Sequence, residues 1–456
     1  MDTQEYLKSL VASARAAQKE FEKYPQEVVD QAVKAIGKVI YDNAVELAHM
    51  AVDETRMGNY ESKIGKCRNK SKSVWWRMKD KKSRGIIERD AETGIMKVAK
   101  PIGVIGCIAP TTNPVITLMH NSMCSLKCGN AIIICPHPRA RKVGVRTTEL
   151  MIGELDKLGM PKNLIQIIPE PTMDLSAGLM SVVDLCICTG GPGMVKAAYS
   201  SGRPAYGVGQ GNVQVLVDRD VDLNEVAKMA ITGRIFDNGV LCTCEQNLIC
   251  SREKADEMIA AMKANGAYYI DNEVDAEKLR NSCFPDGMLN KDWPGASVQK
   301  MAEMAGLEGV PADAKVILSC TKGYAHDDVL AKEKLFPVMA LFLYDTWEEC
   351  MEIARANLEM EGIGHSVVIH SNTDAHIEAV PEVINVSRYA VNQVGGTALG
   401  GAMDNGLNPT TTLGCGTWGN NAISENLWFY HLMNVSRISY KVPTMYVPTD
   451  EEIWAD

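Results

Sequence analysis

Two cysteines, Cys242 and Cys244, stand one residue apart in the segment DNGVLCTCEQN (237–247). Metal binding, disulfide exchange and nucleophilic attack by one thiolate are the three kinds of chemistry that could use them. A zinc site would need two further ligands, and no Cys or His pair lies nearby in the sequence. A bridge between the two sulfurs would close a very strained ring. A single nucleophile and a buried structural thiol remain, and these residues alone favour the structural thiol.

A glycine-rich turn, TGGPGMVKAA (189–198), follows an expected strand and opens an expected helix. Glycines let the backbone approach a ligand closely, and the N-terminus of a helix attracts a phosphate or a dipolar ring. The turn lacks the G-x-G-x-x-G spacing of a dinucleotide fingerprint, so a plain tight turn is an equal alternative.

The segment between Ser62 and Arg84 is strongly basic, with Asp80 as its only acid. Such segments are usually solvated helix faces, and this is the favoured interpretation. The alternative is a patch that meets the phosphates of a nucleotide-like ligand. The ten cationic residues are Lys63, Lys66, Arg68, Lys70, Lys72, Arg77, Lys79, Lys81, Lys82 and Arg84.

The composition is that of a globular protein of two or three domains. The chain has 456 residues, of which 46% are apolar, 23% charged and 6% aromatic. A net charge of −10 disfavours a nucleic-acid binder. Apolar runs such as Ala131–Cys135 are far shorter than a membrane span, so no membrane association is expected.

The N-terminal sequence MDTQEYLKSLVASARAAQKEF lacks the basic start and the apolar block of a signal peptide. Fourteen cysteines are dispersed among strand-like segments, which suits a reducing compartment better than a disulfide network does. We therefore expect a mature, cytoplasmic protein.

Hydrophobic periodicity predicts three successive regions. Residues 1–80 are helical by pattern, and GIIERDAETGIMKVA (85–99) predicts a β-hairpin around a polar turn. From residue 101 strands alternate with helices, which predicts parallel βαβ units in a doubly wound, Rossmann-like α/β fold. The expected strands are 102–110, 131–136, 164–171, 184–191 and 213–218, followed by QNLIC, KVIL, VMALFLY, HSVVIH and RYAVNQ.

These patterns predict a first domain of helices and a dinucleotide-binding sheet over residues 1–234, and a second α/β domain over 235–426. The boundary falls just before Cys242, at an interface where clefts form. Residues 427–456 form a C-terminal segment that returns to the first domain, and ISYKVPTMYVP (438–448) has strand character. The hairpin and this segment need strands to pair with, so we expect a small β element that joins subunits.

Three motifs resemble those of the aldehyde dehydrogenase superfamily. APTTNPV (109–115) resembles its Pro-x-Asn-x-Pro motif, TGGPG (189–193) its glycine turn beneath the nicotinamide, and KEKLFPV (332–338) its Glu-x-Phe-Gly-Pro-Val motif. The similarity spans about residues 5–440 and implies the superfamily's fold. Four longer segments are similar to its CoA-acylating branch: AAYSSGRPAYGVGQGN (197–212), FDNGVLCTCEQ (236–246), GIGHSVVIH (362–370) and NPTTTLGCGTWGNN (408–421).

The resemblance implies roles for the motif residues. Cys242 is the nucleophile and Cys244 is incidental. Asn113 and the backbone N–H of Cys242 hold the oxyanion. His365 matches a branch histidine that assists deprotonation of the CoA thiol, with a hydrogen-bonded structural histidine as an equal alternative. The residues implied to bind the cofactor are Thr111, Thr112, Pro136, His137, Pro138, Arg139, Thr189, Gly190, Gly191, Val208, Gly209, Glu333 and Leu335.

One departure from the hydrolytic members favours CoA as the acyl acceptor. Those members carry a Glu that activates water in a Glu-Leu-Gly-Gly-Lys segment, whereas the matching region here reads YGVGQGN (206–212) and holds no carboxylate. Water is a slow acceptor without a general base, but a thiol with a pKa of about 8.5 needs far less help. The expected reaction converts an aldehyde, CoA and NAD(P)+ to acyl-CoA and NAD(P)H through a thioester on Cys242, and it is reversible.

The expected cofactor is NADP(H), with NAD(H) as the alternative. PHPRARK (136–142) carries Arg139, Arg141 and Lys142, and no acid appears from residue 131 to residue 148. A carboxylate near this position binds the ribose 2′-hydroxyl of NAD, whereas an arginine accommodates a 2′-phosphate.

The segments AVDETRMGNYESKIGKC and MDNGLNPTTTLGCGTWG look closest to the succinate-semialdehyde branch, which implies a short anionic aldehyde. Acetaldehyde, propanal and sulfoacetaldehyde remain alternative substrates.

Two other functions are alternatives to this activity. A hydrolytic enzyme would form free acid without CoA, and a non-catalytic protein on this fold would not need Asn113, Cys242 and Glu333. Microcompartment cargo usually bears an extra N-terminal helix, for which the chain leaves little room. The resemblance to the superfamily, whose members form dimers or tetramers, implies a homodimer or homotetramer.

Overall fold

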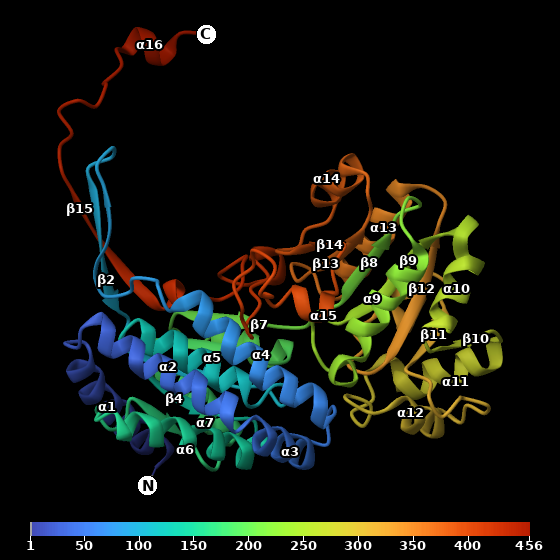
Figure 1. The fold of residues 1–456 in the computed structure, drawn as a ribbon, viewed down its shortest axis with the longest axis horizontal. Coiled ribbons are helices and arrows are strands. Elements are labelled where there is room, and N and C mark those ends of the chain that lie inside the picture. The colour runs from blue at the N-terminus through green and yellow to red at the C-terminus, as the bar shows by residue number, and fades with distance from the viewer. Residues whose placement is uncertain (1) are drawn as a thin grey trace.

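The computed structural model describes residues 2–456, which form two α/β bodies side by side and a narrow β ribbon that projects from the first body (Figure 1). The C-terminal segment extends beyond the ribbon, away from both bodies. Among residues 2–456, no helix is both long enough and apolar enough to cross a bilayer.

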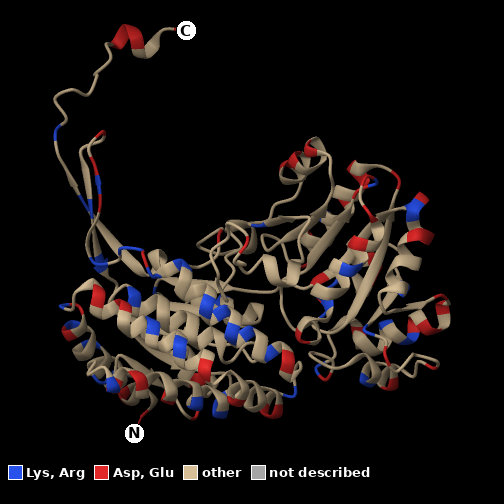
Figure 2. Cartoon of the chain, in the orientation of Figure 1, with Lys and Arg blue, Asp and Glu red and all other residues tan. Residues whose placement is uncertain are grey.

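Four helices open the chain, as their apolar periodicity predicts. Asn59 begins the fourth of them, because its side chain accepts a hydrogen bond from the N–H of Ser62 at 2.9 Å. This helix carries the basic segment, and Lys and Arg recur along it (Figure 2). The four are α1 (Thr3–Phe21), α2 (Gln26–Asp42), α3 (Ala44–Thr55) and α4 (Tyr60–Met78).

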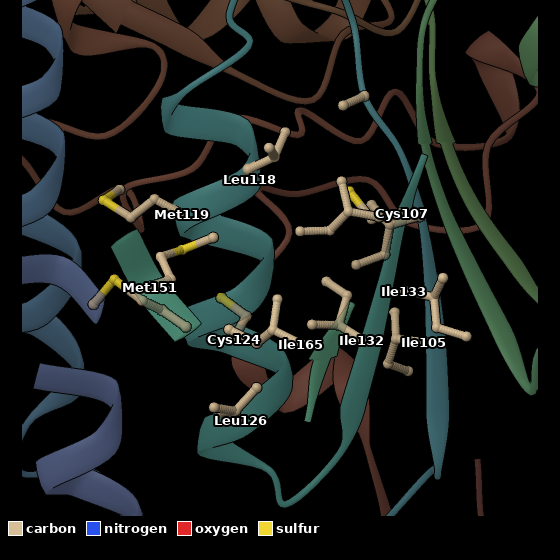
Figure 3. Packing of buried hydrophobic residues seen from close by; sticks show 14 of the residues in the cluster. Ile105, Cys107, Leu118, Met119, Cys124, Leu126, Ile132, Ile133, Met151 and Ile165 are labelled. Atoms are coloured by element: carbon tan, nitrogen blue, oxygen red, sulfur yellow. The ribbon is translucent and has the colours of Figure 1, made fainter. Parts of the chain in front are cut away.

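The first body is built on a parallel sheet with the strand order β5-β4-β3-β6-β7. The chain order reverses between β3 and β6, and a doubly wound sheet binds ligands at such a point, beyond the carboxyl ends of its strands. Apolar side chains of β3, β4 and α5 pack in one buried cluster (Figure 3). The elements are β3 (Val104–Ile108), α5 (Ile116–Lys127), β4 (Ala131–Cys135), α6 (Arg141–Lys157), β5 (Ile165–Ile167), α7 (Met173–Val182), β6 (Leu185–Thr189), α8 (Pro192–Tyr199) and β7 (Ala205–Val208).

The second body is built on a parallel sheet with the strand order β10-β11-β12-β9-β8-β13-β14, and buried apolar clusters cover both of its faces. Its strands are β8 (Val213–Val217), β9 (Glu245–Ser251), β10 (Ala267–Ile270), β11 (Val316–Cys320), β12 (Val338–Tyr344), β13 (Val367–His370) and β14 (Tyr389–Val391). Its helices are α9 (Leu223–Ile235), α10 (Ala255–Ala264), α11 (Glu273–Cys283), α12 (Val298–Ala305), α13 (Trp347–Met360), α14 (Asp374–Val383) and α15 (Gly395–Ala398).

The strands expected from the sequence are confirmed, but one was assigned to the wrong sheet. β8 pairs with β9 and β13, so the chain passes to the second sheet between β7 and β8 rather than near residue 234. Periodicity shows that 213–217 is a buried strand, yet it cannot show which neighbours pair with it. The four-residue strands β7 and β10 were not predicted.

The hairpin predicted at 85–99 is confirmed, and a strand of the same chain joins it. β1 (Gly85–Asp90) pairs antiparallel with β2 (Ile95–Pro101), and β15 (Met433–Ser439) pairs along the other edge of β2. The strand character predicted for 438–448 is wrong beyond Ser439, because β2 begins at Ile95, opposite that residue, and Pro443 lacks the N–H that a ladder requires. A short helix, α16 (Asp450–Trp454), follows.

Candidate active site

A cavity of about 450 Å³, here called the larger cavity, lies at the carboxyl ends of the strands of the first sheet and reaches the segment before β9. The loops that follow parallel strands gather at one edge of a sheet, so segments distant in the sequence meet there. Every residue predicted to bind the cofactor lines it except Arg139: Thr111, Thr112, Pro136, His137, Pro138, Thr189, Gly190, Gly191, Val208, Gly209, Glu333 and Leu335.

A second cavity of about 320 Å³, here called the smaller cavity, lies between α4 and the loops around residues 400 and 411. The two cavities share three wall residues, Asn113, Cys242 and Thr411. Asn113 and Cys242, both predicted to be catalytic, therefore stand where a ligand in one cavity can react with a ligand in the other.

The two cysteines differ in their access to these cavities. Cys242 is partly exposed, whereas Cys244 is fully buried, lines neither cavity and lies with its sulfur 3.8 Å from the carbonyl oxygen of Phe236. Burial, with a smaller contribution from Glu333, raises the pKa of Cys242 to about 12, so its thiol is protonated at neutral pH. No group of three or more His, Cys, Asp and Glu within residues 2–456 could hold a metal ion. The geometry favours Cys242 as the nucleophile.

Lys66 fixes the orientation of the Asn113 amide. Its ammonium donates a 2.8 Å hydrogen bond to Asn113 Oδ1, which leaves Nδ2 as the end that can donate to a ligand. Nδ2 has only a long contact of 3.4 Å, to Thr112 Oγ1. The backbone N–H of Cys242 has no acceptor in the described part of the chain. Two N–H donors are thus available to an oxyanion on the carbon that Cys242 attacks.

Asp237 holds Lys66 in place. Its fully buried carboxylate pairs with Lys63 at 2.9 Å and with Lys66 at 2.5 Å, and Lys63 also donates to the carbonyl oxygen of Thr112 at 3.3 Å. Asp237 lies at φ 52° in a short turn, η2 (Phe236–Gly239), that leads to Cys242. The network therefore ties α4 and the loop after β3 to the nucleophile.

The favoured interpretation of the basic segment as a solvated face is wrong for two of its lysines. Lys63 and Lys66 are only 4% and 7% exposed. Residues three apart share one helix face, and here that face lies against the candidate active site. The remaining cationic residues lie on the rest of α4 and in the segment that follows it, up to Arg84.

Glu333 lies on the wall of the larger cavity beside a second acid. Its Oε1 accepts a 3.0 Å hydrogen bond from the N–H of Gly211, and its own N–H donates to Glu361 Oε2 at 2.8 Å. Burial and the neighbouring Glu361 raise the pKa of Glu333 to about 8. Gln210 also lines this cavity, and its amide donates to Glu361 Oε1 at 2.8 Å. The segment 206–212 therefore brings an amide, and no carboxylate, to the cavity.

His365 lines neither cavity. Its ring is fully buried, and neither ring nitrogen has a hydrogen-bond partner in the described structure, so the structural alternative of a hydrogen-bonded ring is not observed. The Arg388 guanidinium donates to its carbonyl oxygen at 2.7 Å. Burial and this arginine hold the pKa of His365 well below its usual value. Its part in deprotonating a thiol stays a prediction that requires the ring to become accessible.

Arg139 lies in η1 (Pro138–Ala140), exposed and outside the larger cavity, although its neighbours His137 and Pro138 line that cavity. Arg141 pairs with Glu170, whereas Arg139 forms no ion pair within residues 2–456. The prediction that Arg139 shares this binding surface is therefore not met by the cavity lining, and its contact with a cofactor stays a prediction.

Sequence reasoning missed the supporting residues Lys66, Asp237 and Thr411. Each lay in a segment that had been singled out: the basic segment, the cysteine segment and the NPTTTLG motif. The i, i+3 spacing of Lys63 and Lys66 was the available signal, but only the folded chain shows that these segments touch.

Comparison with known proteins adds independent information. A profile described as the aldehyde dehydrogenase family matches residues 1–276. The chain is 51% identical over 454 residues to succinate-semialdehyde dehydrogenase (acetylating) of Clostridium kluyveri, covering 100% of both chains. An acetylating aldehyde dehydrogenase from Geobacillus thermoglucosidasius has a similar structure, with a TM-score of 0.93 and 36% identity, covering 98% of both chains. Rhodopseudomonas palustris propionaldehyde dehydrogenase, solved with bound CoA and an acylated cysteine, gives a TM-score of 0.85 and 27% identity, covering 95% of this chain and 97% of that one.

Proposed function

The chain belongs to the aldehyde dehydrogenase family, and we propose that it is a CoA-acylating enzyme that interconverts succinate semialdehyde, CoA and NADP+ with succinyl-CoA and NADPH. The observation that carries this proposal is the position of Cys242 and Asn113 on the wall between two cavities. Similarity along the whole chain to the Clostridium kluyveri enzyme supports the choice of aldehyde. Acetaldehyde, propanal and sulfoacetaldehyde are the alternative substrates.

The first half-reaction forms a thioester. Cys242, which is protonated at rest, gives up its thiol proton to water in the cavity, and its sulfur adds to the aldehyde carbon. The aldehyde oxygen becomes an oxyanion that Asn113 Nδ2 and the Cys242 N–H stabilise. When bound, NADP+ supplies the acceptor for the hydride that leaves the tetrahedral adduct. Loss of hydride restores the carbonyl and leaves a succinyl thioester on Cys242.

The larger cavity fits the nicotinamide end of a dinucleotide. Its walls come from the loops at the switch point of the first sheet, where doubly wound folds bind nucleotides. A Cβ atom added at Gly191 or Gly209 would meet no heavy atom within 4 Å, so the backbone there is open to a ligand. Arg139 outside the cavity supports a preference for the 2′-phosphate of NADP.

The second half-reaction transfers the acyl group to a thiol. The CoA thiolate attacks the thioester carbon, and the Cys242 thiolate leaves. Gln210 stands in the segment where hydrolytic members carry Glu, and Glu333, the one carboxylate on the wall of the larger cavity, is buried and held by Gly211. The Glu that activates water in the hydrolytic members is thus replaced by an amide, which favours the thiol as acceptor.

The test is a comparison of products with and without CoA. We expect succinyl-CoA and NADPH to form together at equal rates when CoA is present, and steady-state turnover to fall at least about tenfold when it is omitted. The Cys242→Ser variant should lose activity, whereas the matched Cys244→Ser variant should keep most of it. Release of succinate at full rate without CoA would show a hydrolytic enzyme instead.

We also propose a homodimer or homotetramer that acts in the cytoplasm. Exposed apolar side chains on the C-terminal segment support an interface, since Tyr446, Val447 and Trp454 are 71%, 82% and 81% exposed. All fourteen cysteines are free thiols, which supports a reducing compartment.

A further inference from the structure

The smaller cavity has a cationic wall. Lys66, Lys70 and Lys72 of α4 contribute to it, and no Asp or Glu does. The rest of the lining is made of glycines, hydroxyl groups, apolar side chains and the amides of Asn69 and Asn113, together with Cys242. Asp237 balances the charge of Lys66 from outside this cavity, but no acid on the wall balances the other two lysines. Such a wall, next to a reactive thiol, is suited to an anionic group on the molecule that the thiol attacks.

The three lysines are not equivalent. Lys66 is already engaged by Asp237 and Asn113, and Lys72 is exposed near the ring of Tyr41. The ammonium of Lys70 donates to the carbonyl oxygen of Gly400 at 2.9 Å, and no carboxylate within residues 2–456 pairs with it. Burial and the charge of Lys66 lower the pKa of Lys70 to about 8, as expected for a cation that lacks a counter-charge.

A second unpartnered group lies on the same wall. The hydroxyl oxygen of Thr411 is buried and has no hydrogen-bond partner in the described structure, and Thr411 borders both cavities next to Cys242 and Asn113. Buried polar groups are nearly always paired, so this hydroxyl indicates that a polar ligand belongs here. Two independent features thus point to a polar, anionic ligand in the smaller cavity.

The spacing along α4 matches the length of a four-carbon chain. Lys66 contacts Asn113 at the reacting end, and Lys70 follows one turn later, a rise of about 6 Å. Three C–C bonds of about 1.5 Å each, one C–O bond of about 1.2 Å and a hydrogen bond of about 2.8 Å span at most about 8 Å, which exceeds that rise. A carboxylate three bonds from the aldehyde carbon is therefore long enough to extend from the Asn113 end of the smaller cavity to the next turn of α4, where Lys70 lines the same cavity.

We propose that Lys70 binds the carboxylate at the far end of the aldehyde, and so selects a four-carbon semialdehyde with a free acid over uncharged aldehydes of the same length. The inference rests on the proposed acylating function and assigns the specificity of the same site. Its substrate class is a short aldehyde with a terminal anion, which enters from the side opposite the dinucleotide.

The experiment compares two aldehydes in the purified enzyme. The ratio of kcat/KM for succinate semialdehyde to kcat/KM for butanal, with CoA and NADP+, should fall by about 10- to 100-fold in Lys70→Met, because a hydrogen bond to a charged group is lost. Lys70→Arg should recover part of the ratio. The matched control is Arg68→Met, which removes an exposed charge of the same helix that lines neither cavity and should leave the ratio unchanged.

The outcomes separate this inference from the proposed function. The melting curve first shows that Lys70→Met is folded. The role of Lys70 is overturned if this variant lowers kcat/KM equally for both aldehydes. It is also overturned if the unaltered enzyme does not prefer succinate semialdehyde to butanal. If Lys70→Met lowers kcat/KM for sulfoacetaldehyde alone, the assignment to a carboxylate is overturned as well. If no aldehyde gives CoA-dependent NADPH formation in the unaltered enzyme, the proposed function itself fails.

Discussion

A single amide can stabilise an oxyanion only when its nitrogen, and not its oxygen, faces the reacting carbon. In this protein the ammonium of Lys66 holds Asn113 Oδ1 at 2.8 Å, and the carboxylate of Asp237 holds that ammonium at 2.5 Å. Lys66 thus acts on the reaction through Asn113, as a positioning residue.

Replacing Lys66 by Met should therefore lower kcat by about 10- to 100-fold, since removing one oxyanion donor outright costs about 10²- to 10³-fold. The KM for the aldehyde should change much less, and Lys66→Arg should restore part of kcat. Steady-state kinetics with each variant, alongside its melting temperature, provides the measurement.

A double-mutant cycle with Asn113→Ala tests whether Lys66 acts through that amide. In the Asn113→Ala background, Lys66→Met should cause little further loss, because the amide that it orients is gone. Equal losses in the two backgrounds would mean that Lys66 acts independently of Asn113.

Among the secondary-structure elements, α4 links the fold to the chemistry. Its spacing of three and four residues places Lys63, Lys66 and Lys70 in a row past the loop after β3, the turn before Cys242 and the smaller cavity. The charge of α4 predicts a surface helix. In the folded protein, α4 forms a wall of the candidate active site.

The β ribbon is the second element with an evident task. β15 completes the three-stranded sheet within one chain, and the segment beyond it carries exposed Met445, Tyr446, Val447 and Trp454. Such residues, far from either core, suit burial against another subunit.

Deleting residues 441–456 should lower the oligomeric state while leaving both bodies folded. Light scattering after size exclusion gives the mass, and far-ultraviolet circular dichroism checks the fold. The double variant Val447→Ser, Trp454→Ser should weaken the oligomer in the same direction without removing backbone. An unchanged mass in both proteins would assign the interface to another surface.

At the scale of the whole molecule, the larger cavity joins the two bodies. Its walls combine the loops of the first sheet with Cys242, Leu289 and Glu333, which follow the passage of the chain to the second sheet. A ligand bound there contacts both bodies and stabilises the folded protein by mass action.

NADP+ at a hundredfold excess over its dissociation constant should stabilise the protein by about 2.7 kcal/mol, which is a rise of several degrees in melting temperature. Arg139→Ala should reduce this rise for NADP+ and leave the smaller rise for NAD+ unchanged, because the lost guanidinium meets only the 2′-phosphate. The matched control is Arg146→Ala, which removes an arginine of α6 that pairs with Glu46 and lines neither cavity. An equal effect of Arg139→Ala on both cofactors would contradict its role.

The sequence by itself determined most of the helices and strands, the parallel doubly wound architecture, and the residues predicted to line the larger cavity, Arg139 excepted. These follow from local periodicity and from motifs in which the reacting residues and their neighbours are close in the chain. The hydrophobic pattern suffices for the secondary structure, because an element that is buried on one face or on two has a characteristic period of apolar residues.

Tertiary structure alone decided which sheet takes β8, that Cys244 and His365 are sealed away, and that Lys63, Lys66 and Lys70 face inward. Each of these depends on contacts between segments a hundred or more residues apart, such as Lys66 with Asp237. The physical reason is that the sequence of a helix is the same whether its lysine is solvated by water or paired with a carboxylate from a distant turn. Only the packing of the helix against that turn distinguishes the two.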